Sequence, residues 1–375
     1  MPEPVPPLDL LRLPDAVEPY QLEPSDEEIA RTAGIGLDQV IRFDLNTLGG
    51  GPLPGVVDAM AQFNPGRLVE YSDPSYAELR AAISDAIGAE AGCIIPGAGA
   101  DELIRLATTM VVGAGDTVLI PTPTFPMFAV EARLAGARVV PLPRRSLAVR
   151  QGVDEIRAAV ESTNARLLWI CSPNNPTADL YSLAELEAIA DGLPAMVVVD
   201  AVYQEFAETS LGLAPEALSP IPLQSRVPNL LVLRSLAKAY GLAGARVGYL
   251  VTSPALAERF EAARLPISVA SASQAAALGA LADPEAARDR QRLLVGERER
   301  LAAVCRERGW EVLDSVTNFI LLRPPDAPAV EAALARRGLV VRAYPPGPLS
   351  AWLRITARAP IENDRLLAAL PAAEQ

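Results

Sequence analysis

The sequence contains no histidine among its 375 residues. This absence excludes imidazole general bases, nucleophiles activated by histidine and metal sites with histidine ligands. Cysteine is scarce too: Cys93, Cys171 and Cys305 are too few and too scattered for a zinc cluster or a disulfide framework, which favours a reducing compartment. We therefore predict no metal site and assign proton chemistry to Lys, Tyr, Asp, Glu or Cys side chains.

Long apolar runs and excess positive charge are also lacking. No apolar run approaches the length that spans a bilayer. The Pro-rich start, Met1–Pro7, has no basic region followed by an apolar stretch, so no signal peptide is predicted. The formal net charge of −13 argues against a nucleic-acid surface. We expect a cytoplasmic protein with small-molecule substrates and neither a nucleic-acid nor a membrane partner.

What the sequence does contain is an alternation of apolar runs and helical patterns. Helices are predicted at Asp101–Val112 and Ser182–Asp191, and capping boxes at Ser75–Glu78 and Ser182–Glu185 mark two helix starts. Continuous Val/Ile/Leu runs are typical of strands covered on both faces. Strands are predicted for seven runs: 93–95, 117–120, 138–142, 167–171, 196–199, 230–233 and 247–251. The alternation predicts an α/β fold with a mostly parallel, doubly wound sheet.

The same pattern divides the chain into three parts. Residues 1–45 are Pro-rich and acidic and are expected to form an N-terminal arm. Residues 46–262 hold the alternating pattern and are expected to form the large domain. Residues 263–375 are expected to form a small α+β domain, with a long helix at Asp283–Arg308, a helix at Ala329–Arg337, and strand candidates at Thr317–Leu322, Leu339–Arg342 and Trp352–Thr356.

Polar residues follow several of the predicted strands, where an open parallel sheet gathers its functional groups. The small residues at 96–100 lead into a helix whose N-terminus can bind an anion; a tight turn without a ligand is the alternative. Asp200 ends one apolar run and Lys238 follows the next. A buried carboxylate needs a cation or several donors, so the two could form an ion pair, or Lys238 could be a Schiff-base amine.

Three motifs occur in order: SPNNPT at 172–177, the pair Asp200 and Tyr203, and SLAKAYGLAGARVGY at 235–249. With them the chain resembles the fold-type-I pyridoxal-phosphate (PLP) dependent aminotransferases of class I/II, from Glu18 to Arg365, and is most similar to histidinol-phosphate aminotransferases. The resemblance implies a large domain with a mostly parallel sheet, a small α+β domain, bound pyridoxal 5′-phosphate, and a homodimer with a shared active site.

The resemblance also implies roles for individual residues. It makes Lys238 the amine that holds the cofactor, Asp200 the partner of the pyridinium nitrogen, and Tyr203 a donor to the cofactor's phenolic oxygen; these are the catalytic residues. The other cofactor-binding residues that it implies are Gly99, Ala100, Asp101, Phe125, Asn175, Ser235, Arg246 and, from the neighbouring subunit, Tyr71.

Four residues are candidates for substrate binding by the same resemblance. Arg354 matches an arginine that grips the substrate α-carboxylate. Arg342 matches an arginine that relatives can use for a substrate phosphate, with a solvated strand-end arginine as the alternative. Tyr20 and Asn46 lie in the two segments that shape the side-chain pocket.

The chain departs from the family pattern in those two segments. The Pro-Gly that usually follows Tyr20 is missing, and Gly49–Gly51 lies in a stretch where relatives show Asn-Glu-Asn-Pro. Ala237 also stands where relatives usually carry Ser, which removes a hydroxyl from the phosphate site. The departures in the two segments concern the substrate, whereas Ala237 concerns the cofactor's phosphate.

The activity that the resemblance implies is transamination between an amino acid, with glutamate as the expected donor, and a keto acid or a phosphorylated ketone. It implies a place in amino-acid biosynthesis, with histidinol phosphate and 2-oxoglutarate as the leading pair and an aromatic amino acid as another substrate. Two alternatives stay open: a decarboxylase similar to threonine-phosphate decarboxylase, and a non-catalytic protein with the same fold.

Overall fold

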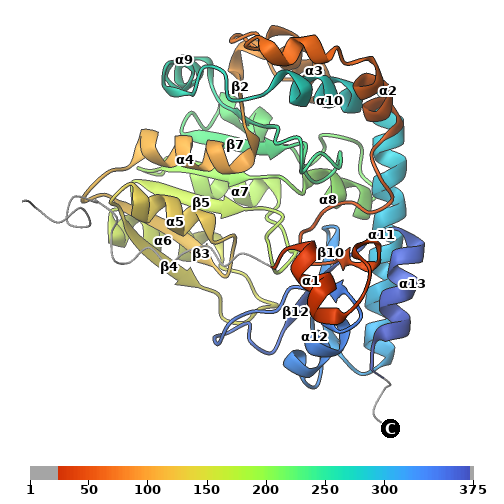
Figure 1. The fold of residues 1–375 in the computed structure, drawn as a ribbon. Coiled ribbons are helices and arrows are strands. Elements are labelled where there is room, and N and C mark those ends of the chain that lie inside the picture. Colours follow the sequence, from red (N-terminus) through yellow and green to blue (C-terminus); the bar gives the residue numbers. More distant parts are fainter. Residues whose placement is uncertain (1–23, 372–375) are drawn as a thin grey trace, which may run out of the picture.

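The computed structural model describes residues 24–371, which are organised around a seven-stranded sheet (Figure 1). Its strand order is β2-β8-β7-β6-β5-β3-β4, and only β8 runs antiparallel to its neighbours. The strands are β2 (Ile94–Gly97), β3 (Thr117–Thr122), β4 (Arg138–Pro143), β5 (Leu167–Cys171), β6 (Met196–Asp200), β7 (Leu230–Ser235) and β8 (Gly248–Val251). Each coincides with one of the seven apolar runs, so the predicted mostly parallel sheet is confirmed.

Helices cover both faces of this sheet, which explains why its strands are apolar on both sides. Alternate residues of β6 point to opposite faces: Val198 packs in one core cluster, and Val197 and Val199 in the other. The first cluster is covered by α4 (Gly99–Val111), α5 (Met127–Leu134) and α9 (Pro254–Ala263). The second is covered by α6 (Val153–Thr163), α7 (Leu183–Ala190) and the 3₁₀ helix η5 (Ile221–Ser225).

A further group of helices packs at the β2–β8 edge, as Figure 1 shows. It comprises α2 (Pro54–Gln62), α3 (Ala77–Ile87) and α10 (Ser271–Leu281), with the short helices η3 (Pro65–Val69) and η4 (Ala91–Cys93) nearby. Helices α2 and α10 pack closely at two glycines. A Cβ on Gly279 would lie only 2.3 Å from the Gly55 carbonyl oxygen. Helix α10 belongs to the predicted small domain by its residue numbers, but it packs against α2 and α3 of the predicted large domain. The boundary at residue 262 remains a prediction.

A smaller α+β layer completes the described chain. Its antiparallel sheet has the order β12-β10-β9, and a parallel pair joins β1 to β11. Its elements are α1 (Asp26–Ala33), η2 (Leu37–Gln39), β1 (Ile41–Arg42), α11 (Pro284–Glu307), β9 (Glu311–Val312), β10 (Phe319–Arg323), α12 (Ala327–Ala335), β11 (Leu339–Val340), β12 (Leu353–Thr356) and α13 (Pro360–Ala369). Helix α8 (Gln204–Ser210), which follows β6 of the large sheet, packs against α11. The long helix α11 was predicted correctly, with Asp283 as its N-cap.

The two predicted capping boxes have different outcomes. At α7 the prediction is confirmed, since Ser182 and Glu185 each accept the other's backbone N–H. At α3 it is wrong: the Asp73 carboxylate accepts the N–H groups of Ser75 and Ala77. Tyr76 takes a left-handed conformation there, with φ of 52°, and its ring is fully buried. Core packing of this ring therefore overrides the capping signal.

No helix in the part of the chain between residues 24 and 371 combines the length and apolar character needed to cross a membrane. Helix α11 is the longest of those described, with 24 residues, and carries many charged side chains.

Candidate active site

A cavity of about 690 Å³ lies at the carboxyl ends of the parallel strands, where functional groups collect in folds of this kind. Its floor comes from the segments after β3, β5, β6 and β7, and its opposite wall from residues 44–47 and 342–354. Twelve predicted site residues line it: Asn46, Ala100, Asp101, Phe125, Asn175, Asp200, Tyr203, Ser235, Lys238, Arg246, Arg342 and Arg354. Segments far apart in the sequence thus meet at one place.

Lys238 projects its amine into this cavity from the loop after β7. Its Nζ donates to the Leu45 carbonyl oxygen at 3.2 Å. Burial and, next to it, the positive charge of Arg354 lower the pKa of the amine from 10.5 to about 8. About a tenth of the amine is therefore uncharged at pH 7 and about half at pH 8, and the uncharged form is the one that acts as a nucleophile or a base.

Asp200 ends β6 at the floor of the cavity and is buried. Its Oδ1 accepts the backbone N–H of Val202 at 3.1 Å. Burial raises the pKa of the carboxyl from 3.8 to about 7, because this one hydrogen bond and the charge of Lys238 offset only part of the cost of desolvation. A carboxylate in this position is well placed to pair with a cationic ligand.

The raised pKa of Asp200 predicts a stability change with pH in the cofactor-free protein. Between pH 3.8 and about 7 the folded protein holds a proton that the unfolded chain has released, so the free energy of unfolding falls as the pH rises through this window. Asp200→Asn lacks this titration. We expect wild type to lose on the order of 4 kcal/mol relative to Asp200→Asn over the window. Urea unfolding of both proteins at several pH values measures it; a constant difference would contradict it.

Tyr203 and Asn175 present a phenol and an amide to the same cavity. The Tyr203 hydroxyl accepts a hydrogen bond from Asn46 Nδ2 at 2.8 Å, and burial raises its pKa, so it stays protonated. Asn175 Oδ1 accepts from Arg354 Nη1 at 2.6 Å. Arg354 also donates to the Asp44 carbonyl oxygen, while its buried Nε has no partner among the described residues. The guanidinium is thus held in place with donor capacity to spare.

The start of helix α4 forms a small cradle beside these groups. In the first turn of a helix, the amides of residues such as Ala100 and Asp101 have no carbonyl partner within the helix. A Cβ on Gly99 would lie 2.6 Å from Arg246 Nη2, and a Cβ on Gly248 would lie 2.9 Å from the Ala100 nitrogen. Arg246 itself is paired with Asp101 at 2.6 Å. Glycines thus let backbone amides and a guanidinium approach one point, an arrangement suited to a phosphate.

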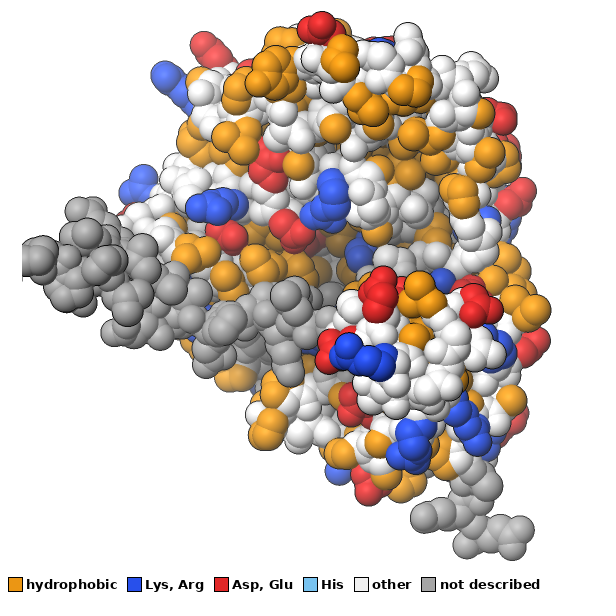
Figure 2. Space-filling model, viewed as in Figure 1, with side chains coloured by type: hydrophobic (Ala, Val, Ile, Leu, Met, Phe, Trp, Pro, Cys, Tyr) orange, Lys and Arg blue, Asp and Glu red, His pale blue; other side chains and the backbone are white. Residues whose placement is uncertain are grey.

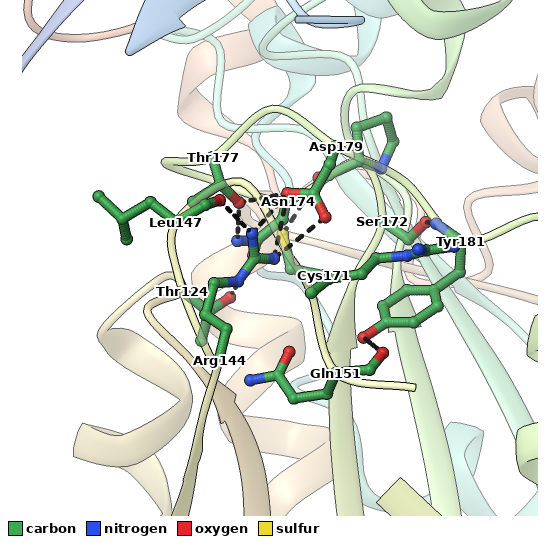
Figure 3. A network of polar contacts seen from close by, with 12 residues as sticks. Thr124, Arg144, Leu147, Gln151, Cys171, Ser172, Asn174, Thr177, Asp179 and Tyr181 are labelled. Carbon is green, nitrogen blue, oxygen red and sulfur yellow. Dashed lines mark hydrogen bonds and ion pairs between the residues drawn. The ribbon is translucent and has the colours of Figure 1, made fainter. Parts of the chain in front are cut away.

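A polar network behind the cavity holds the SPNNPT loop (Figure 3). Asn174 donates from Nδ2 to Thr177 at 2.7 Å and to the Pro123 carbonyl at 2.9 Å, and its Oδ1 accepts from Thr124 at 2.7 Å. Asp179 accepts from Thr177 and from both terminal nitrogens of Arg144. Asn174 is thus a structural member of the motif, and the neighbouring residue 175 is the one that faces the cavity.

Three predicted site residues lie elsewhere. Gly99 stands behind the cavity wall against Arg246. Tyr71 is 89% exposed and does not line the cavity of its own chain. Tyr20 lies outside the described residues. The structure therefore brings together all the predicted residues that one subunit was expected to supply, apart from Gly99 and Tyr20.

Sequence reasoning missed two features of the cavity. Arg133 of α5 lies in its wall with Phe125 and Ala129. Ala129, Val130 and Arg133 belong to α5 and are three and four residues apart, so one face of this helix runs along the cavity, a signal that the periodicity contained. The second missed signal is a count: Lys238 is the only lysine in the chain. Because this single lysine lies inside the cavity, it indicates chemistry that arginine cannot replace.

Comparison with known proteins agrees with this geometry. Residues 38–370 match the family model described as aminotransferase class I and II. The histidinol-phosphate aminotransferase of Roseiflexus castenholzii is 35% identical over 361 residues, which cover 94% of each chain. The aromatic amino acid aminotransferase of Corynebacterium efficiens is 34% identical over 344 residues, covering 90% of this chain and 95% of that one.

Solved structures agree as well. The crystal structure of histidinol-phosphate aminotransferase from Sinorhizobium meliloti, in complex with pyridoxal-5′-phosphate, has a TM-score of 0.83 and 30% identity; it covers 93% of this chain, and 94% of that chain is matched. The predicted fold and enzyme class are thereby confirmed. The chain belongs to the aminotransferase class I and II family.

Proposed function

We propose that the protein is a homodimeric, PLP-dependent aminotransferase whose amino substrates are anionic: glutamate, with two carboxylates, and histidinol phosphate, with a phosphate and no carboxylate. The observation that carries this proposal is the convergence of Lys238, Asp200, Asn175 and Tyr203 on one cavity beside the start of α4. These four groups come from three separate segments of the chain, and packing of the core alone does not require them to meet.

The residues present fit pyridoxal phosphate. The cradle of α4 and Arg246 suits its phosphate, Asp200 its pyridinium nitrogen, and Tyr203 and Asn175 its phenolic oxygen. When bound, the cofactor supplies an electron sink for the charge that develops at the substrate α-carbon. The buried Asp200 carboxylate would keep the ring nitrogen protonated, which is the condition for that sink.

Lys238 would serve both as the attachment point for the cofactor and as the base. Its lowered pKa lets Nζ lose a proton near neutral pH, and its tether lets the same atom accept a proton from the substrate α-carbon and deliver it elsewhere. The Leu45 carbonyl holds Nζ on the cavity side. This assignment also agrees with the absence of histidine from the chain.

Arg354 would bind the substrate α-carboxylate. A guanidinium binds a planar carboxylate through two parallel hydrogen bonds. Asn175 and the Asp44 carbonyl fix the orientation of the Arg354 side chain before substrate arrives, which reduces the entropy that binding must overcome.

The charge of the cavity supports anionic substrates, which include both glutamate and histidinol phosphate. Its wall in the described part of the chain holds five cationic side chains, Arg133, Lys238, Arg246, Arg342 and Arg354, against three carboxylates, Asp44, Asp101 and Asp200. Asp44 pairs with Arg42 and Asp101 with Arg246. The outer surface differs, because acidic and basic side chains are mixed over the face drawn in Figure 2 and the net charge is −13. Local cations thus decide which ligands enter.

The homodimer is supported by the exposed residues around Tyr71. Leu68, Val69 and Tyr71 are 63%, 82% and 89% exposed, and Leu265 is 62% exposed. Large apolar side chains exposed together mark a surface that a partner covers. A second copy covering this surface would bring Tyr71 to the neighbouring cavity; light scattering that gave a monomer mass would contradict this part.

A half-reaction screen tests the function. The purified protein is loaded with pyridoxal phosphate, and loss of its visible absorbance is followed as glutamate, histidinol phosphate, aromatic amino acids or threonine phosphate is added one at a time. Conversion to the pyridoxamine form with histidinol phosphate and with glutamate supports the proposal. Carbon dioxide release without that conversion identifies a decarboxylase, and binding without turnover on any donor identifies a non-catalytic protein.

Substitution of Arg133 predicts a change of specificity. Arg133→Ala removes one cation from the wall and should lower kcat/KM for histidinol phosphate about tenfold or more, since a charged hydrogen bond contributes about 1.5–3 kcal/mol. Glutamate and an uncharged aromatic donor, measured in parallel, provide the comparison. Arg105→Ala is the matched control, because the Arg105 side chain is 68% exposed and lies outside the cavity. Equal losses for histidinol phosphate and the aromatic donor would contradict a specificity role.

A further inference from the structure

Three consecutive residues of the cavity wall each contact a different functional side chain. The Asp44 carbonyl accepts from Arg354, the Leu45 carbonyl accepts from Lys238 at 3.2 Å, and Asn46 Nδ2 donates to the Tyr203 hydroxyl at 2.8 Å. From the sequence, Asn46 was a candidate for substrate binding. Its side chain instead lies against Tyr203 and is 1% exposed, so its amide is occupied by the protein itself.

Thr356 determines which end of the Asn46 amide faces Tyr203. The Thr356 hydroxyl oxygen accepts the Asn46 backbone N–H at 3.1 Å, and the hydroxyl donates to Asn46 Oδ1 at 3.0 Å. With the amide flipped, the Thr356 oxygen could accept from both nitrogens of Asn46, but the buried hydroxyl hydrogen would then have no acceptor in the described part of the chain. The amide oxygen is therefore turned to Thr356 and the NH₂ group to Tyr203.

The backbone of Asn46 is fixed in the same way. Asn318 Nδ2 donates to the Asn46 carbonyl at 3.2 Å, and Asn46 holds a left-handed conformation with φ of 54°. Thr356 and Asn318 are fully buried. The amide thus has a single set of partners, none of them solvent.

This arrangement sets the direction of the Tyr203 hydroxyl hydrogen. The NH₂ group of Asn46 has no lone pair to accept it, so the phenol receives a hydrogen bond from Asn46 and must donate its own hydrogen elsewhere. The Tyr203 ring is kept in place by Phe319, with ring centroids 5.3 Å apart and planes at 81°. The remaining direction open to the hydrogen is the cavity that Tyr203 lines.

We propose that Thr356 and Asn46 are positioning residues that make Tyr203 a permanent donor toward an anionic oxygen in the cavity. On the proposed function, on which this inference rests, that oxygen is the phenolic oxygen of the cofactor. Thr356 lies two residues from Arg354 on β12, so both side chains leave the same face of that strand. One strand would then bind the substrate carboxylate and orient the donor to the cofactor.

The test is a pH titration of the visible absorbance of the bound cofactor, without substrate. A donor to the phenolic oxygen stabilises its negative charge and lowers the pKa of the titrating cofactor group. Asn46→Asp replaces the NH₂ donor by an acceptor that turns the Tyr203 hydrogen away from the cavity. We expect the cofactor pKa to rise by about one unit, the value of one hydrogen bond.

Two further sets of variants separate positioning from other effects. Thr356→Val keeps the shape of the side chain but removes the hydroxyl, and should raise the cofactor pKa, whereas Thr356→Ser should leave it at the wild-type value. In a Tyr203→Phe background Asn46→Asp should add little, since no phenol remains to be turned. A full shift in that background would show that the new charge acts directly, and would overturn the inference.

The outcomes distinguish this inference from the proposed function. Wild-type protein with a titrating cofactor band, together with Thr356→Val and Asn46→Asp variants that titrate at the wild-type pH, would overturn the positioning role and leave the aminotransferase function intact. Failure of wild type to take up pyridoxal phosphate would overturn both. Because Thr356→Val is nearly isosteric, its result decides the matter even if Asn46→Asp fails to fold.

Discussion

Lys238→Ala is expected to abolish transamination, with kcat falling at least about 10⁴-fold. The variant loses the amine that would hold the cofactor and the only tethered base within reach of the substrate α-carbon, and a positioned base alone contributes about 10²–10⁴-fold. The neighbouring cationic side chains Arg354 and Arg246 supply no replacement, because a guanidinium only donates hydrogen bonds and has no acceptor for a proton. The measurement is kcat with saturating amino donor and excess pyridoxal phosphate.

The attachment itself can be mapped because Lys238 is the only lysine. A protease that cuts after lysine should divide the untreated protein into two fragments, residues 1–238 and 239–375. Borohydride reduction of the loaded protein should block that cut and add the cofactor's mass to the chain. Cleavage that is unaffected by reduction would refute the covalent role of Lys238. Lys238→Arg is the control, because the protease cannot cleave it at position 238 and the cofactor cannot attach to it there.

Asp200→Ala is expected to lower kcat on the order of 10³-fold, the loss typical of removing one preorganised electrostatic partner. Asp200 would be the anionic partner of the cofactor's ring nitrogen, and without this carboxylate the protein would no longer favour the protonated ring that serves as the electron sink. Asp200→Asn should be nearly as slow, because an amide keeps the shape but not the charge. Asp200→Glu should recover part of the rate.

The cofactor content and the thermal unfolding temperature of each variant are measured together with its steady-state kinetics. The expected pattern is a stable, cofactor-loaded protein with a low kcat. A rate within tenfold of wild type for Asp200→Asn, at full cofactor occupancy, would contradict the ion-pair role. In the cofactor-free protein the raised pKa of Asp200 makes Asp200→Asn relatively more stable above pH 7, so thermal unfolding should show no loss of stability for this variant.

Much of this site could be predicted from sequence because its parts follow buried strands. Asp200 and Asn175 stand at or just beyond apolar runs, and a parallel sheet brings such ends to one edge whatever the details of the loops. The apolar runs also located all seven strands of the large sheet. What was predicted correctly was therefore governed by local pattern and by the topology of the sheet.

What escaped prediction depends on contacts between distant residues. Asn46 is 310 residues from Thr356 and 157 residues from Tyr203, and no local pattern relates them. The left-handed Tyr76 that displaces a capping box is stabilised by Arg264 over its ring and by the Val269 N–H, which its hydroxyl accepts. Such roles are set by tertiary packing, which overrides the local signal.

The structure shows what holds the glycine loop after Asn46 in place. Arg290 of α11 donates to the carbonyl groups of Gly49, Gly50 and Gly51, so one guanidinium binds three successive peptide units. A Cβ on Gly49 would lie 2.1 Å from Glu362 Oε2 and 2.7 Å from the Ala359 nitrogen. A loop transplanted from a homologue with any side chain at this position would collide with α13. A chimera that exchanges this loop for one with a side chain at position 49 should therefore exchange residues 359–362 with it.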